Sequence, residues 1–312
     1  MNISQELSES GKFDEIIESG MHHFDELVEP DLLSGIYANV ARQRACGPDM
    51  FLSEAEFDAC PQYVGVNPVP GRNFVEQYSD ELAVIESHPA LTSYLSALLG
   101  PQYEILNKKM ICGVPESVIP HWLKNRIEGN FVNNLGSYIR PELRDMTYFW
   151  GIDLHQDIID WKSRFADFIT LYIYIHDVGA KNSPLYVLPG SHKLGATVFP
   201  HSIEKSGGDV NRLEYSDGRG HSIATEYHKL LGPVGTANLW HPFTLHGTQP
   251  NKDDQPRFSL RYLISREPAA ESCGLDLVNS SIKGPMSLEN TRDDLAKDGA
   301  AGKKGNIINK IE

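Results

Sequence analysis

The sequence of 312 residues lacks several features that would place it in particular protein classes. No apolar run approaches the roughly 18 residues that a membrane-spanning helix needs. The polar, acidic stretch over residues 1–18 does not resemble a signal peptide. The four cysteines form no CxxC pair, which argues against a zinc knuckle or a disulfide framework. We therefore expect reduced thiols in a cytoplasmic protein that has no membrane partner.

Basic residues are also scarce. The chain has 28 Lys and Arg against 42 Asp and Glu, a formal net charge of -14. Nucleic-acid binding needs a basic face, so no nucleic-acid partner is expected. A hydrophobic content of 40% and a charged content of 22% are typical of a globular protein with a substantial core. The oligomeric state cannot be read from these numbers.

The first third of the chain is predicted to be helical, over about residues 20–100. Pro30 lies at the first turn of a helix predicted over 30–44. Apolar residues at helical spacing return over 82–85 and 91–99, and Gly100 ends the second of these helices. Because their apolar residues fall on one side, these helices are predicted to pack on another layer.

The middle of the chain reads as short strands separated by turns, which predicts a mainly β fold with flanking helices and a core over about 101–268. Strand patterns cover 103–112, 165–177, 185–188, 235–240 and 257–264. Along 165–177, the face that carries Tyr172 and Tyr174 is aromatic with polar tips, as a cavity wall would be. Both tyrosines are therefore candidate substrate contacts.

Other stretches lack such a pattern. Residues 113–151 are long and irregular and precede His155, which predicts a lid. Residues 201–222 are polar and rich in glycine, which predicts a loop. The charged stretch beyond about 280 predicts a polar, mobile tail over 280–312. With no internal repeat, we expect a single domain over 1–312.

His155 and Asp157 are the first candidate metal ligands. Side chains two residues apart point the same way on extended backbone, so both can bind one ion. His246 is the favoured third ligand, with His241 as its competitor. Two histidines and a carboxylate form the facial triad of non-haem Fe(II) oxygenases, which leaves positions open for a co-substrate and O₂.

Arg257 supports this interpretation. It follows His246 by 11 residues, and its guanidinium suits the distal carboxylate of a chelating co-substrate such as 2-oxoglutarate. Arg261 shares the same strand face, but lies about 13 Å further along at roughly 3.3 Å per residue. We expect Arg261 at the surface or behind the metal ligands. The hydroxyl of Ser259, between the two arginines, is expected to assist Arg257.

Four motifs give a more specific indication: His155-Gln156-Asp157, Leu188-Pro189-Gly190-Ser191-His192, Trp240-His241 through His246-Gly247-Thr248, and Pro250-Asn251 with Arg257. In order and spacing over about 100–265 they resemble the phytanoyl-CoA dioxygenase family of Fe(II)/2-oxoglutarate oxygenases. One departure is Thr236-Ala237, where many relatives have a Gly-Asp pair.

The resemblance implies a double-stranded β-helix, the jelly-roll or cupin-like core. It implies His155, Asp157 and His246 as iron ligands and Arg257 as the clamp on 2-oxoglutarate. Further co-substrate contacts are implied at Thr248, at Trp161, and at Asn107 or Lys109. Relatives that halogenate lack the carboxylate ligand, so the presence of Asp157 favours hydroxylation.

The predicted function is hydroxylation of an unactivated C–H bond in a small molecule, with a natural-product intermediate as the favoured substrate. The reaction uses O₂ and converts 2-oxoglutarate to succinate and CO₂. The alternatives are a zinc hydrolase on the same ligands and a non-catalytic cupin-like binding protein. Three lid arginines are either parts of a solvated loop or clamps for an anionic substrate group: Arg126, Arg140 and Arg144.

Overall fold

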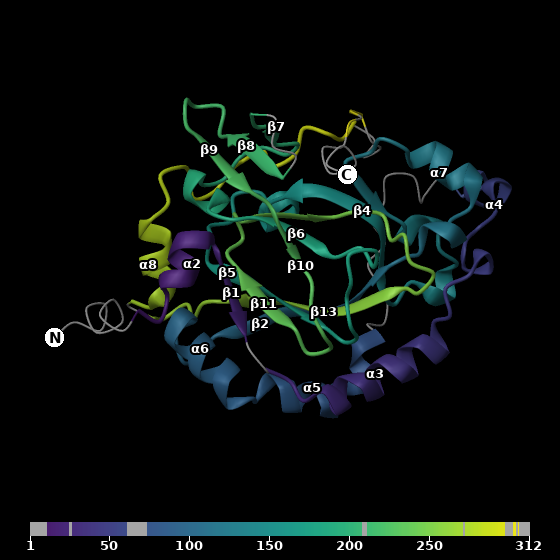
Figure 1. The fold of residues 1–312 in the computed structure, drawn as a ribbon, viewed down its shortest axis with the longest axis horizontal. Helices are drawn as coiled ribbons and strands as arrows, with labels where there is room; N and C mark the ends of the chain where they lie inside the picture. Colours follow the sequence, from purple (N-terminus) through teal and green to yellow (C-terminus); the bar gives the residue numbers. More distant parts are fainter. Residues whose placement is uncertain are drawn as a thin grey trace.

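The computed structural model describes residues 11–24, 27–60, 74–207, 211–270, 272–296, 302–303 and 305, and of Asp160 only the backbone. Its main sheet has ten strands (Figure 1). Their order is β1 (Met21–Phe24), β11 (Ala237–Trp240), β5 (Phe168–Tyr174), β13 (Arg257–Ser265), β2 (Glu104–Gly113), β4 (Thr147–His155), β12 (Leu245–Thr248), β6 (Leu185–Leu188) and β10 (His228–Leu230), with β3 (Val132–Asn134) paired to β4.

This sheet curls into two halves. Strands β11, β5, β13 and β2 form one half, and β4, β12, β6 and β10 form the other. The halves are joined where β2 and β4 pair in parallel. Tyr172 of one half packs with Leu185 and Val187 of the other, so the two inner faces meet. Because the chain crosses between the halves at nearly every connection, the core is the predicted jelly roll.

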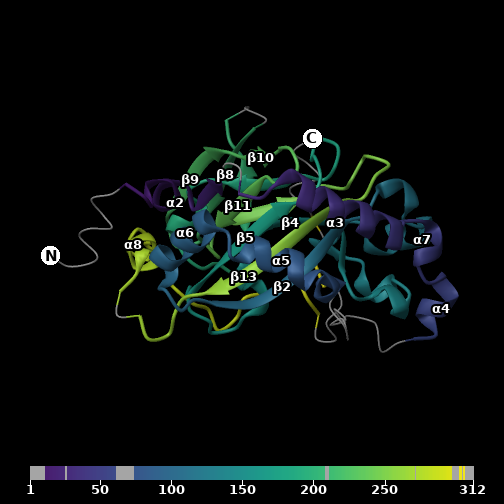
Figure 2. The ribbon, with the colours of Figure 1, turned by 90° about the horizontal axis from the view of Figure 1, so that it is seen from below.

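Helices cover the outer face of the half that contains β5 and β13. They are α3 (Pro30–Gln43), α5 (Ser79–Glu86) and α6 (Pro89–Leu99), and Figure 2 shows them lying across the strands. Their buried apolar residues share one hydrophobic core with Ile169 and Leu171 of β5. The helical region and the two-faced pattern of this strand are therefore as predicted.

The prediction of a loop over 201–222 was wrong. The chain there forms β7 (Ser202–Lys205) and β8 (Arg212–Ser216), which join β9 (Ser222–Glu226) in a separate three-stranded sheet. Leu213 and Tyr215 alternate with exposed residues and are fully buried on the jelly roll. The hairpin reads as a loop because its other face is polar and its turns contain glycine.

The predicted lid over 113–151 contains regular structure. It holds α7 (His121–Ile127) and β3, and β4 already begins at Thr147. The helix α4 (Glu54–Asp58) approaches it from the N-terminal region, where Arg126 pairs with α4. The lid is therefore partly built from short elements whose periods are too brief to be recognised in the sequence.

The expectation of a mobile tail was wrong for residues 281–296. After α8 (Gly274–Ser280), this segment returns to the jelly roll. The hydroxyl of Thr291 donates to the carbonyl of Ile159 at 2.7 Å, and Asp294 is buried. Charged residues can pack in this way when they find partners, which composition alone does not reveal. Most of 297–312 lies outside the described residues.

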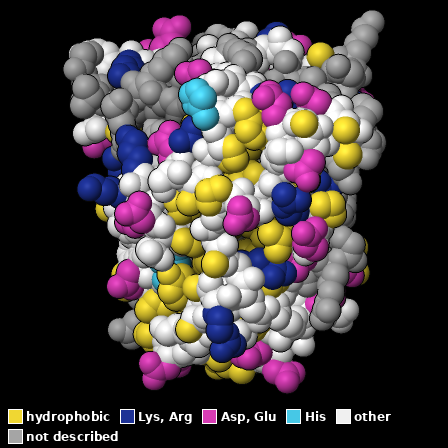
Figure 3. Space-filling view, turned by 90° about the vertical axis from the view of Figure 1, so that its right-hand side faces the viewer, with side chains coloured by type: hydrophobic (Ala, Val, Ile, Leu, Met, Phe, Trp, Pro, Cys, Tyr) yellow, Lys and Arg dark blue, Asp and Glu magenta, His cyan; other side chains and the backbone are white. Residues whose placement is uncertain are grey.

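No helix among the described residues is long and apolar enough to cross a membrane. Figure 3 views the side of the molecule that carries α4 and α7. On this face Lys and Arg side chains are interspersed with Asp and Glu side chains and with apolar ones.

Candidate metal centre and active-site cavity

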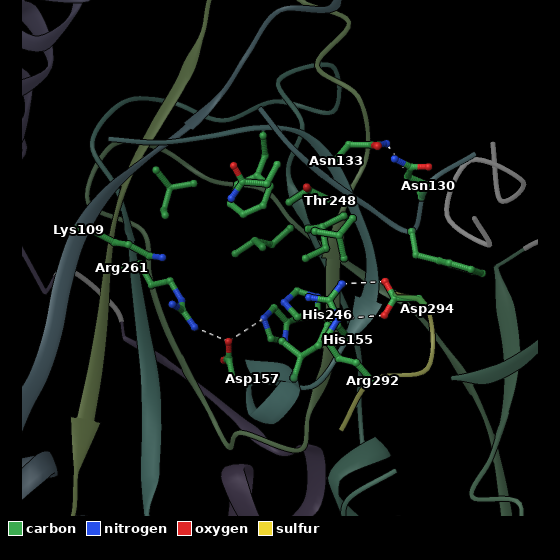
Figure 4. Close-up of a pocket in the computed structure, with 18 of the residues that line it drawn as sticks. Lys109, Asn130, Asn133, His155, Asp157, His246, Thr248, Arg261, Arg292 and Asp294 are labelled. Atoms are coloured by element: carbon green, nitrogen blue, oxygen red, sulfur yellow. Dashed lines mark hydrogen bonds and ion pairs between the residues drawn. The ribbon is translucent and has the colours of Figure 1, made fainter. Parts of the chain in front are cut away.

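A cavity of about 730 Å³ lies between the two halves of the jelly roll. Strands β4, β6 and β12 line one side of it, and β2, β5, β11 and β13 line the other. Residues of the lid and of the C-terminal segment line it as well. Figure 4 shows the three candidate metal ligands in this cavity.

The candidate ligands converge from three elements. His155 is the last residue of β4, Asp157 begins the 3₁₀ helix η7 (Asp157–Asp160), and His246 lies on β12 opposite His155. One ligand atom from each lies within 4.8 Å of the others, and all three residues are buried. Among the described residues this is the one His, Cys, Asp or Glu cluster with such geometry. The predicted triad is therefore assembled by the fold.

Backbone carbonyls orient both imidazoles. The Nδ1 atom of His155 lies 3.0 Å from the carbonyl of Asp153, and that of His246 lies 2.9 Å from the carbonyl of Thr244. A carbonyl only accepts, so each Nδ1 carries the proton and each Nε2 keeps its lone pair for a metal. Burial lowers the pKa of both histidines, and for His155 the neighbouring His246 lowers it further. Both are therefore neutral, as metal ligands must be.

Asp157 is held by groups that the sequence did not single out. Its Oδ2 accepts hydrogen bonds from the Thr170 hydroxyl at 2.5 Å and from the Trp240 indole at 2.9 Å. Its Oδ1 lies 3.7 Å from Nε2 of His246 and contacts Arg261. Burial alone would raise the pKa of Asp157, but the charge of Arg261 and the hydrogen bond from Thr170 hold it below its ordinary value. The carboxylate is ionised and fixed.

Only part of this arrangement had a signal in the sequence. Thr170 lies on the alternating cavity face of β5, so its direction was readable, but its contact with Asp157 was not. Trp240 stands beside the competing histidine and offered no sign of a role. Arg261 was expected either at the surface or behind the metal ligands, and the structure places it against the ligand Asp157.

The donor set fits a divalent transition metal. Two neutral imidazole nitrogens and one carboxylate oxygen, approaching from one side, match the facial triad preferred by non-haem Fe(II). The same atoms also suit Zn²⁺. The three ligands alone therefore do not distinguish Fe(II) from Zn²⁺, so the other residues of the cavity must be considered.

Arg257 is a buried cation without an anion. It is 1% exposed, its guanidinium donates to the carbonyl of Ser183, and its Nε has no hydrogen-bond partner. No carboxylate of the described residues pairs with it, and its guanidinium lies over the Tyr172 ring, 5.7 Å from the ring centre. A buried charge is costly unless it is paired. Arg257 therefore fits a ligand carboxylate inside the cavity.

The other predicted contacts divide into two groups. Five of them line the cavity together with the metal ligands: Asn107, Lys109, Trp161, Tyr172 and Thr248. Ser259 and Tyr174 do not line it. The Ser259 hydroxyl is buried without a hydrogen-bond partner, while the Tyr174 hydroxyl donates to the carbonyl of Leu230 at 2.9 Å and accepts from the Leu185 amide. Tyr174 is thus a satisfied core residue.

The lid arginines are engaged elsewhere. Arg126 lines the cavity, but pairs with Asp58 at 2.8 Å and with Glu54 at 3.3 Å. Arg140 pairs with an acidic residue of α4, and Arg144 donates to the carbonyls of residues 139 and 137. Neither Arg140 nor Arg144 lines the cavity. The structure therefore gives them a role in fixing the lid.

Two other histidines can be placed. His241, the competing ligand candidate, is buried with its Nε2 at 2.9 Å from the side-chain oxygen of Asn279 and lies outside the ligand cluster. His192 of the Leu-Pro-Gly-Ser-His motif is buried and donates from Nε2 to the carbonyl of Ile17 at 3.2 Å. Both are structural, as expected for His192.

Comparison with known proteins agrees with this site. Residues 146–259 match the sequence model of phytanoyl-CoA dioxygenase (PhyH). A probable alpha-ketoglutarate-dependent hypophosphite dioxygenase of Stutzerimonas stutzeri is 34% identical over 121 residues, 39% of this chain and 41% of that protein. An L-proline trans-4-hydroxylase of Streptomyces griseoviridis is 29% identical over 133 residues, 36% of this chain and 47% of that protein. The chain thus spans less than half the length of these relatives.

Solved structures are similar over a longer stretch. The epimerase SnoN, in complex with Fe3+, alpha ketoglutarate and nogalamycin RO, has a TM-score of 0.49 and 13% identity over 96% of both chains. The matched region, 146–259, contains all three metal ligands and Arg257. Over residues 146–259 the predicted resemblance to the phytanoyl-CoA dioxygenase (PhyH) family is therefore confirmed.

Proposed function

We propose that this protein is an Fe(II)- and 2-oxoglutarate-dependent dioxygenase that hydroxylates an unactivated C–H bond of a small molecule. One observation carries the proposal: a buried His–Asp–His cluster and a buried, anion-free arginine line the same cavity. Bound Fe(II), with 2-oxoglutarate and O₂, supplies the oxidising power, and 2-oxoglutarate leaves as succinate and CO₂. The two matched relatives are named for small substrates, hypophosphite and L-proline.

The residues of the chain divide this work. His155, Asp157 and His246 hold the metal, and Arg257 binds the distal carboxylate of 2-oxoglutarate. Thr248 is proposed to add a hydroxyl contact to that carboxylate, whereas Ser259, which does not line the cavity, loses the assisting role expected for it. Trp161, Asn107 and Lys109 are proposed further contacts, and Tyr172 lines the substrate space. The apolar and aromatic lining excludes water around the reacting atoms.

The zinc-hydrolase alternative is less well supported. A hydrolase on this triad needs a further general base beside the metal. The only other carboxylate among the described lining residues is Asp294, and Arg292 holds both of its oxygens at 2.9 and 2.7 Å. Arg257 would also have no role.

A location in the cytoplasm remains part of the proposal, and it is supported by four cysteines that form no disulfide. A single-domain organisation also remains part of the proposal.

The decisive test is succinate release from 2-oxoglutarate in the presence of Fe(II), ascorbate and O₂. Slow uncoupled turnover needs no substrate, so the assay can precede substrate identification. We expect release by the wild type, none above background by His155→Ala, and strongly reduced release by Arg257→Ala at low 2-oxoglutarate. Release by the wild type that does not exceed the His155→Ala background would overturn the proposal.

A further inference from the structure

The residue between the first two candidate ligands has a fully engaged side chain. Gln156 is 1% exposed, although its amide carries two N–H donors and an acceptor oxygen. Its Nε2 donates to the carbonyls of Gly195 at 2.9 Å and Phe243 at 3.0 Å, and its Oε1 accepts from the backbone amide of Thr197 at 3.0 Å. A flipped amide would place its oxygen against two carbonyls, so the orientation of the side chain is fixed.

These hydrogen bonds join segments that carry different ligands. Gln156 lies between His155, the last residue of β4, and Asp157, the first residue of η7. Phe243 belongs to the turn between β11 and β12, three residues before His246. The carbonyl of the residue before Phe243 accepts from the backbone amide of Asp157 at 2.8 Å. The segment with the first two ligands is therefore fastened to the chain that leads into the third.

A further connection reaches the separate three-stranded sheet. The hydroxyl of Thr197 lies 2.6 Å from the hydroxyl of Tyr215 on β8 and 2.7 Å from Nδ1 of His201. Tyr215 is fully buried on the jelly roll. Because satisfied buried networks are rigid, Thr197 is a firm support for the oxygen of Gln156. The glutamine is thus held from both sides of the segment in which it lies.

Resting on the proposed function, we infer that Gln156 is a positioning residue of the metal centre. It holds His155, Asp157 and His246 at the separation that a metal needs, and it does not bind the metal itself. Groups behind the ligands are typically worth about 10- to 100-fold in metal affinity. Gln156 differs from the other such groups of this site, because its bonds go to the backbone that connects the ligands and not to the ligands themselves.

A second buried amide has the same pattern of hydrogen bonds and provides a matched control. The Nδ2 of Asn251 donates to the carbonyls of Gly113 at 3.0 Å and Gln255 at 2.9 Å, and its Oδ1 accepts from the backbone amide of Asp253 at 3.0 Å. All three partners lie outside the segments that carry the ligands. Loss of either amide therefore removes the same kinds of bond, but only Gln156 does so at the metal centre.

Metal binding by the full chain tests the positioning role. Gln156→Met and Asn251→Leu each replace an amide by an apolar group of similar size. Calorimetry gives the Ni²⁺ affinity and the melting temperature of the metal-free protein, and the visible absorption of Co²⁺-loaded protein reports the coordination geometry. Both variants should melt at a lower temperature, since each leaves buried backbone groups without partners. Only Gln156→Met should weaken Ni²⁺ binding, by about tenfold or more, and change the Co²⁺ absorption.

A shorter amide is the second variant, for the case in which Gln156→Met does not fold. Gln156→Asn keeps the amide, but its side chain is one methylene shorter and cannot reach partners on both sides of the segment. We expect it to weaken Ni²⁺ binding and to change the Co²⁺ absorption as well. Asn251→Leu serves as the control for this variant in the same way.

Two results would overturn the inference. One is a folded Gln156 variant with Ni²⁺ affinity within about twofold of the wild type and the same Co²⁺ absorption. The other is an equal loss of Ni²⁺ affinity in Asn251→Leu. The proposed function is read separately: a wild type that binds Ni²⁺ no better than His155→Ala contradicts the metal centre itself. Binding that depends on His155 but not on Gln156 contradicts only the positioning role.

Discussion

The two ends of the cavity are built in different ways. At the metal end, each functional side chain comes from a strand of the jelly roll or from the residue just beyond it, and backbone carbonyls orient both histidines. At the lid end, the lining comes from α7, β3 and the segment 281–296, which are held by ion pairs and short contacts. The candidate metal site thus rests on the regular scaffold, and the opposite end of the cavity rests on short or irregular segments.

This difference teaches where substitutions should be severe. Strand pairing fixes the metal end from several directions, so a lost ligand cannot be replaced by a neighbour. At the lid end, the ion pairs of Arg126 and Arg140 with α4 are about a third or more exposed, and single contacts of that kind contribute little. The following predictions compare the two ends, from the largest effect to the smallest.

The two buried carboxylates of the cavity should respond differently to the same change. Asp157→Asn removes a charged ligand and is expected to weaken Ni²⁺ binding by more than about 100-fold, since even partners behind the ligands are worth about 10- to 100-fold. Asp294→Asn, at the lid end, should keep Ni²⁺ affinity within about twofold. Isothermal titration calorimetry measures both. Equal losses of Ni²⁺ affinity in the two variants would show that the metal end and the lid end of the cavity are not independent.

Arg257 should control 2-oxoglutarate without controlling the metal. Arg257→Gln is expected to raise the KM for 2-oxoglutarate by roughly 30- to 5000-fold, because it removes one partner of a buried charge pair worth about 2–5 kcal/mol. Arg257→Lys should recover only part of the loss, since lysine lacks the fork. Ni²⁺ affinity serves as the control. An unchanged KM in the glutamine variant would assign 2-oxoglutarate to another cation.

The scaffold behind the metal end should unfold in acid. Burial, and then the neighbouring Lys193, lower the pKa of His192 from 6.5 to about 4. The unfolded chain therefore takes up the proton first, so this stabilisation is complete above pH 6.5 and is lost as the pH falls towards 4. Between pH 7 and pH 5 the loss is about 2 kcal/mol for this residue.

Urea unfolding at the two pH values measures this effect. His192→Gln should reduce the difference in the free energy of unfolding between pH 7 and pH 5, and His228→Gln, on the exposed part of β10, serves as the control. The other buried histidines still contribute to the pH dependence of the free energy of unfolding in both variants. An unchanged pH dependence in His192→Gln would contradict the lowered pKa.

The groups that hold Asp157 should have a moderate effect. Thr170→Val removes the hydroxyl that donates to Oδ2 at 2.5 Å while keeping the shape of the side chain. We expect Ni²⁺ affinity to fall about tenfold, at the lower end of the range for such partners. Trp240→Phe should act similarly. Full affinity in both variants would show that Arg261 alone positions the carboxylate.

The smallest effect is expected at the lid. Arg140 pairs with Glu56 at 3.4 Å, and both side chains are more than a third exposed. Arg140→Gln should therefore change the free energy of unfolding by less than about 1 kcal/mol and leave the KM for 2-oxoglutarate unchanged. Denaturant unfolding and steady-state kinetics check the two parts. A large rise in KM would place Arg140 in the cavity after all.

Much of the metal end could be predicted from the sequence. His155 and Asp157 are close in the chain, and the spacing from His246 to Arg257 reflects the short connection from β12 to β13, which lie in opposite halves of the jelly roll. Alternation along β5 separated the helix-facing residues from the cavity-facing ones. These inferences succeed because strand geometry converts sequence distance directly into direction.

The lid end was predicted poorly, and for a physical reason. Asn133 lies far from Arg292 and Asp294 in the chain, and the three residues show no common periodicity. What brings them together is a hydrogen bond of Thr291, the packing of 281–296 and the pairing of β3 with β4. Neither residue type nor spacing encodes such contacts.

The sequence by itself therefore determined the class of the site: two histidines and a carboxylate that converge on one point, and an arginine on a strand of the opposite half of the jelly roll. Only the tertiary structure decided that Arg261 faces Asp157, that the lid arginines are paired, and that Gln156 joins the segments that carry the ligands. The class of the site depends on local backbone geometry, which repeats along a strand. The partners of the charged and polar side chains depend on long-range packing, because each buried charge pairs with the group that the fold brings near.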